Sequence, residues 1–111
     1  MSAPLEGRLF IDGEFREARS GKRYPIINPA DESVVAEAAD AGVEDVDDAI
    51  AAARRFIDTS DWTTNHEFRK RCMVQFQEGL RARADEFENI MVAEAGVARA
   101  NMWTHVRFMI E

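Results

Sequence analysis

The sequence predicts an α/β fold: two β-hairpins over residues 8–40, long helices over 42–58 and 64–95, and a truncated third helix over 98–111. Before residue 40, short apolar segments alternate with turn residues, which is typical of hairpins. After residue 40, apolar residues recur every three or four positions, which is typical of amphipathic helices. Hydrophobic residues make up 46% and charged residues 32% of the chain. This balance indicates a globular chain, with a disordered N-terminus predicted only over residues 1–7.

The hairpins are predicted from their turns. Asp12-Gly13 lies between apolar residues, and a type I′ turn needs positive φ at both central positions. Pro25 has no amide hydrogen to donate, so its segment is expected at a sheet edge or at a strand start. The Asn28-Pro29 pair turns the chain again before a short returning strand at residues 34–36.

The first helix is predicted from one apolar face and from its charges. Acidic residues crowd its first turns, and Arg54 and Arg55 lie near its end, which complements the helix dipole. Gly42 is an acceptable N-cap. The apolar face consists of Val43, Val46, Ala49, Ile50, Ala53, Phe56 and Ile57.

The second helix is predicted to start at Thr64, with Glu67 three residues later completing a capping box. Gly79 lies inside this helix, at a cost of about 1 kcal/mol relative to alanine. Gly96 is a natural C-terminal stop. The third helix carries apolar residues to the chain end without a cap, which suggests a sequence that is cut and not finished.

Composition excludes several partners. The net charge is −7, and no basic stripe is present that could follow a phosphate backbone, so nucleic acid is not expected. No apolar run approaches the roughly 18 residues of a membrane span, and no secretion signal is found. A single cysteine, Cys72, cannot form an internal disulfide. We therefore expect a cytoplasmic protein without membrane contact.

Residue patterns for catalysis are missing. The six glycines are scattered, so no phosphate-binding loop is predicted. His66 and Cys72 are six residues apart on one helix, about 240° around its axis, and His105 is remote. A zinc site is therefore not expected. Cys72 could be a nucleophile beside basic neighbours, but its place on the apolar stripe favours a packing role.

Several segments in succession resemble the N-terminus of the aldehyde dehydrogenase superfamily. Each segment is weak alone, but their order and intervals are specific, and the resemblance covers nearly the whole chain up to about Gly96. The segments are Leu9-Phe-Ile-Asp-Gly-Glu-Phe15, Ser20-Gly-Lys22, Ile26-Ile-Asn-Pro29, Val34-Val-Ala-Glu37, Glu44-Asp-Val-Asp-Asp-Ala-Ile50, Ala52-Ala-Arg54, Trp62 and Glu94-Ala-Gly96.

The resemblance implies part of an NAD(P)-binding domain in an enzyme that oxidises aldehydes to carboxylic acids. In that family a cysteine attacks the aldehyde, hydride passes to NAD or NADP, and a glutamate activates water. An asparagine side chain and a backbone amide stabilise the tetrahedral intermediate. Those residues belong beyond residue 111, and Cys72 and Glu94 do not match the catalytic pair. We therefore expect no catalytic or cofactor-binding residue in this chain, and no NAD or NADP bound by the chain alone.

One family site is implied within the chain. Some members bind a monovalent cation through a backbone carbonyl before the Asn-Pro pair and through an acidic side chain near the helix-ending glycine. The matching positions are Ile27 and Glu94. A hard cation needs several oxygen ligands, so further ligands would lie outside this chain. After the long helix the family often has Gly-Lys-Pro, whereas this chain has Gly96-Val97-Ala98, which leaves the substrate subclass open.

Two hypotheses follow for the whole chain. The first is a fragment of an aldehyde dehydrogenase that is inactive alone and packs against the remainder of the dehydrogenase or a homo-oligomer partner. The alternative is a free-standing, non-catalytic interaction or oligomerisation module derived from that family.

Overall fold

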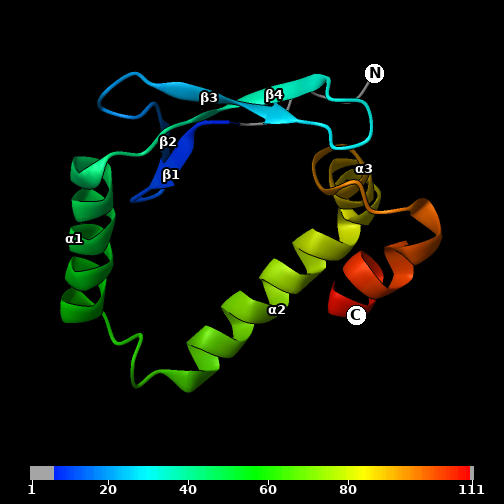
Figure 1. Cartoon of the computed structure of the whole chain (residues 1–111). Helices are drawn as coiled ribbons and strands as arrows, with labels where there is room; N and C mark the ends of the chain where they lie inside the picture. Colours follow the sequence, from blue (N-terminus) through cyan, green and yellow to red (C-terminus); the bar gives the residue numbers. More distant parts are fainter. Residues whose placement is uncertain (1–6, 111) are drawn as a thin grey trace. The chain divides into compact units, whose positions relative to one another are not determined.

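The computed structural model describes residues 7–110, shown with their secondary structure in Figure 1. The chain divides into two compact units. The first holds residues 7–26 and 36–64, and the second holds residues 27–35 and 65–110. The predicted disorder of residues 1–7 falls mostly outside the described residues.

Strands β1 (Leu9–Ile11) and β2 (Glu14–Arg16) form the first antiparallel hairpin. Phe10 lies opposite Phe15, and their ring centroids are 5.0 Å apart. Asp12 and Gly13 have φ values of 55° and 81°, the positive values that a type I′ turn requires. The predicted first hairpin is confirmed.

Strands β3 (Arg23–Ile27) and β4 (Val34–Ala39) form the second two-stranded sheet. The turn between them is held by Asn28, whose side-chain oxygen accepts from the Ala30 amide at 2.9 Å. The Asn28 carbonyl accepts from the Glu32 amide, also at 2.9 Å. This confirms the turn predicted at the Asn-Pro pair.

Gly7 corrects the end of the predicted disordered segment. Its carbonyl accepts from the Ala39 amide at 2.6 Å, so the backbone at Gly7 is bound to the end of β4. A Cβ atom at Gly7 would lie 2.0 Å from the Glu37 carbonyl oxygen, so only glycine fits this approach.

Helix α1 (Val43–Thr59) begins after Gly42, as predicted. The predicted apolar face exists, but most of its large side chains are exposed. The helix contacts β1, and its less exposed positions are Asp45, Asp48, Ala49 and Ala52. The side of α1 with small and acidic residues is therefore the one with neighbours in this unit.

The helix predicted over residues 64–95 is divided into α2 (His66–Ala82) and α3 (Ala84–Ala95). Arg83 leaves helical geometry, with ψ of 18°, and its side chain pairs with Glu86 at 2.7 Å. The prediction of one continuous helix is wrong, because it relied on apolar spacing, and that spacing continues across the break.

The predicted cap is also wrong: Asn65, not Thr64, caps α2 by accepting from the Phe68 amide at 3.0 Å. Gly96 ends α3 in the left-handed conformation, as predicted.

The helix predicted over 98–111 is also corrected. The chain instead forms a 3₁₀ turn, η1 (Arg99–Asn101), a π-helical segment, η2 (Trp103–Arg107), and one short turn, α4 (Phe108–Ile110). Met102 and Val106 are buried. Arg107 binds Glu88 at 2.7 Å and Asp85 at 2.5 Å, which ties η2 to α3. The arginine pairs are tertiary contacts with α3, which the apolar spacing within residues 98–111 does not show.

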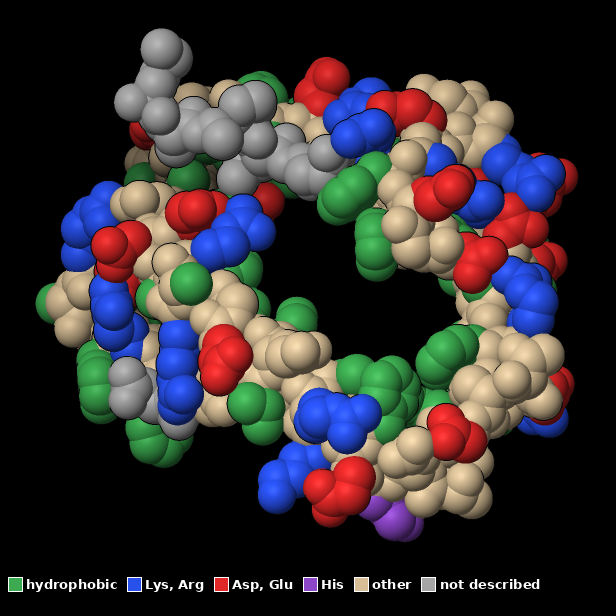
Figure 2. Space-filling view, turned by 180° about the vertical axis from the view of Figure 1, so that it is seen from behind, with side chains coloured by type: hydrophobic (Ala, Val, Ile, Leu, Met, Phe, Trp, Pro, Cys, Tyr) green, Lys and Arg blue, Asp and Glu red, His purple; other side chains and the backbone are tan. Residues whose placement is uncertain are grey.

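The described residues contain little apolar core. Their buried hydrophobic side chains are Ala18, Ala39, Ala84, Met102 and Val106, whereas many larger ones are exposed. Figure 2 shows hydrophobic side chains at the surface beside charged ones. Within residues 7–110, no helix is both long enough and apolar enough to cross a membrane.

Candidate functional site

A polar cluster joins β2 and the following loop to the start of α1. The Asp45 side chain is only 1% exposed. Its carboxylate accepts from the Gly42 amide at 3.0 Å and from the Arg19 amide at 3.2 Å. Arg16 lies 3.6 Å from the same carboxylate. A buried carboxylate is tolerated because it is hydrogen-bonded and lies beside a cation.

Asp48, one turn later, accepts from two arginines. Arg19 donates at 2.6 Å and Arg16 at 2.8 Å. The hydrogen bond from Arg19, followed by the one from Arg16, lowers the pKa of Asp48 below its ordinary value. The same contact raises the pKa of Arg19. The cluster therefore stabilises the unit that contains the first hairpin and α1, and its charges are internally neutralised.

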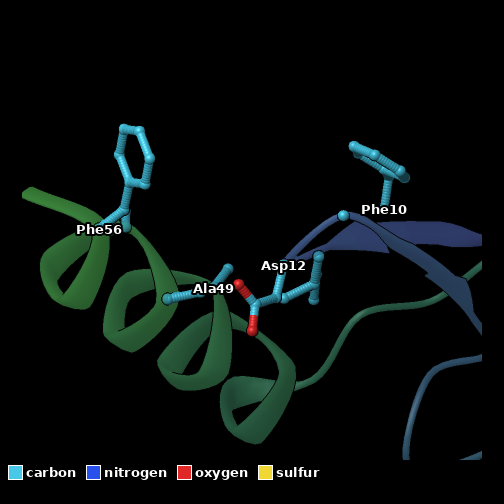
Figure 3. A pocket seen from close by; sticks show the side chains of 8 residues that line it. Phe10, Asp12, Ala49 and Phe56 are labelled. Atoms are coloured by element: carbon cyan, nitrogen blue, oxygen red, sulfur yellow. The ribbon is translucent and has the colours of Figure 1, made fainter. Parts of the chain in front are cut away.

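An open apolar groove of about 340 Å³ lies between the β1–β2 turn and α1. Figure 3 shows Phe10 and Phe56 on either side, with the Asp12 carboxylate directed toward α1 near Ala49. Arg55 donates to Asp12 at 2.6 Å at this edge. Further lining comes from Ile11, Gly13, Ala52 and Ala53. The groove presents no described nucleophile, so it is a surface for apolar contact and not a reaction centre.

In the second unit, the turn between β3 and β4 packs against the C-terminal end of α3. A Cβ atom at Gly96 would lie 2.8 Å from Cγ of Pro29, so the proline ring packs against the glycine. Ile27 is the last residue of β3, two residues before Pro29, and Glu94 lies two residues before Gly96. Both side chains are exposed. The segments that carry the two predicted cation ligands are therefore in contact with each other, through Pro29 and Gly96.

The other residues considered for chemistry lie apart. Cys72 is half-buried on α2 and is a free thiol. His66 opens α2 and lies beside Arg69, whereas His105 lies in η2. In the part of the chain that the structure describes, no group of three or more His, Cys, Asp or Glu side chains is placed to hold a metal ion.

Sequence reasoning missed the buried role of Asp45. The sequence places Asp45 among the acidic residues that complement the dipole in the first turns of the helix. Its position three residues after Gly42 was the available signal, because an acidic side chain at that position can reach back to the N-cap amide. Its bond to the Arg19 amide is a tertiary contact that no local pattern shows.

Comparison with known proteins agrees with this fold. The model of the aldehyde dehydrogenase family matches residues 15–111. Aldehyde dehydrogenase 1 of Tanacetum cinerariifolium is 36% identical over 108 residues, covering 91% of this chain and 22% of the relative. Cytosolic 10-formyltetrahydrofolate dehydrogenase of Mus musculus is 35% identical over 106 residues, covering 94% of this chain and 12% of the relative. The chain thus spans about a fifth or less of the length of these relatives.

Solved structures give the same result. A betaine aldehyde dehydrogenase from Staphylococcus aureus, in complex with NAD⁺, superposes with a TM-score of 0.88 at 22% identity, covering 96% of this chain and 22% of that one. The gamma-glutamyl-gamma-aminobutyraldehyde dehydrogenase of Burkholderia cenocepacia superposes with a TM-score of 0.84 at 35% identity, covering 88% of this chain and 20% of that one. The chain, with its two hairpins and its helices, belongs to the aldehyde dehydrogenase family.

Proposed function

We propose that this chain is the N-terminal section of a cytoplasmic NAD(P)-dependent aldehyde dehydrogenase, and that it is not catalytically competent alone. The observation that carries the proposal is the family match over residues 15–111 together with coverage of only 22% of a relative. The exposed apolar side chains of the helices support it, because such surfaces usually mark contact with further protein.

The chemistry of the parent reaction needs groups that this chain does not supply. A cysteine nucleophile needs a lowered pKa and solvent access, and Cys72 instead lies half-buried on a helix. Its glycines do not form a phosphate cradle, so the described residues do not fit a nicotinamide dinucleotide. The chain's contribution is structural: it adds two hairpins and the first helices to the cofactor-binding domain.

The reading frame that encodes the chain tests this proposal. We expect it to continue past Glu111 into a glycine-rich cofactor loop and a catalytic cysteine. The protein from that longer frame should reduce NAD⁺ or NADP⁺ in the presence of an aldehyde, as measured by absorbance of the reduced nicotinamide. A stop codon directly after Glu111 in the intact gene would contradict the proposal.

Ile27 and Glu94 are proposed as part of a monovalent cation site in the complete enzyme. The packing of Pro29 on Gly96 supports this, since it brings the two segments together. Further oxygen ligands would come from outside this chain. In the longer protein, K⁺ or Na⁺ should raise the melting temperature, and Glu94→Gln should reduce that rise. An equal rise in both proteins would remove Glu94 from the site.

A second candidate function is a free-standing, non-catalytic interaction module. The large exposed side chains Phe10, Ile50 and Phe76 favour it, because they offer apolar surface without any reactive group. Light scattering on the purified chain measures its molar mass in solution and so shows whether the chain associates. A compact monomer with a cooperative melt would remove the need for a partner and would contradict this candidate.

A further inference from the structure

We draw no further inference here: the strongest candidate, the open apolar groove between the β1–β2 turn and α1, is an unpartnered apolar surface, and nothing in the structure shows what covers it.

Discussion

At the scale of single residues, two glycines on neighbouring helices should respond in opposite ways to a methyl group. Gly96 has φ of 64° and packs against Pro29, whereas nothing lies within 4 Å of a Cβ atom at Gly79. Gly96→Ala should lower the free energy of unfolding by at least about 1–2 kcal/mol, because of left-handed strain and the proline contact. Gly79→Ala should raise it by about 0.5–1 kcal/mol, because alanine favours helix. Urea denaturation followed by circular dichroism measures both, and equal effects would contradict this account of the two sites.

The buried carboxylate of Asp45 gives a second prediction. Asp45→Asn should lower the free energy of unfolding by about 1–3 kcal/mol, because the amide group can no longer accept from both the Gly42 and Arg19 amides without misplacing its own N–H donors. Asp47→Asn is the matched control on the exposed surface, with an expected change within about 0.5 kcal/mol. If both variants have the same free energy of unfolding, Asp45 does not stabilise the start of α1.

Asp48 gives a pH-dependent prediction. Its pKa in the folded chain is lowered, chiefly by Arg19, so the folded state favours the charged carboxylate. Its contribution to stability is therefore present above its ordinary pKa near 4 and is lost as the pH falls through the lowered value. Asp48→Asn should lower the melting temperature near neutral pH, and the difference from the parent chain should shrink as the pH falls below the ordinary carboxyl value near 4. A difference in melting temperature between variant and parent that does not change with pH would show that ionisation of Asp48 does not contribute to stability.

At the scale of elements, local chemistry determined what could be read from the sequence. The Asp12-Gly13 turn and the Gly96 stop were predictable, because each needs positive φ, which few residue types adopt. The Gly42 cap was predictable from the acidic first turn that follows it, since Gly42 itself is extended. The break at Arg83 was not predictable from apolar spacing, since Ala84 and Phe87 continue the helical period past it. The same limit applies to η2, because the pairs of Arg107 with Asp85 and Glu88 are tertiary contacts that no local pattern shows.

The pairs of Arg107 give a prediction for η2. Arg107→Gln removes the bonds to Glu88 and Asp85 and should loosen the segment after Gly96 while α1 and α2 remain folded. Amide hydrogen exchange should therefore increase over residues 99–110 and stay unchanged over residues 43–59. An increase spread evenly over the chain would indicate that the ion pairs support the whole molecule and not this segment.

At the scale of the whole molecule, the family and its ordered motifs were readable from the sequence, and the match over residues 15–111 confirms them. For the candidate site, the sequence offers only two positions, Ile27 and Glu94, and the cation site there stays a prediction. The groove between Phe10 and Phe56 was not predictable, since it depends on how α1 is turned against the first hairpin. Hydrophobic spacing identifies which face of a helix is apolar, but it does not identify the partner that covers it.

The most direct test of the central claim is a nicotinamide assay on the purified 111-residue chain, with a complete aldehyde dehydrogenase as positive control. The account predicts no aldehyde-dependent formation of NADH or NADPH, and no tight binding of either oxidised dinucleotide by calorimetry. Robust turnover by this chain, abolished by Cys72→Ala, would contradict it.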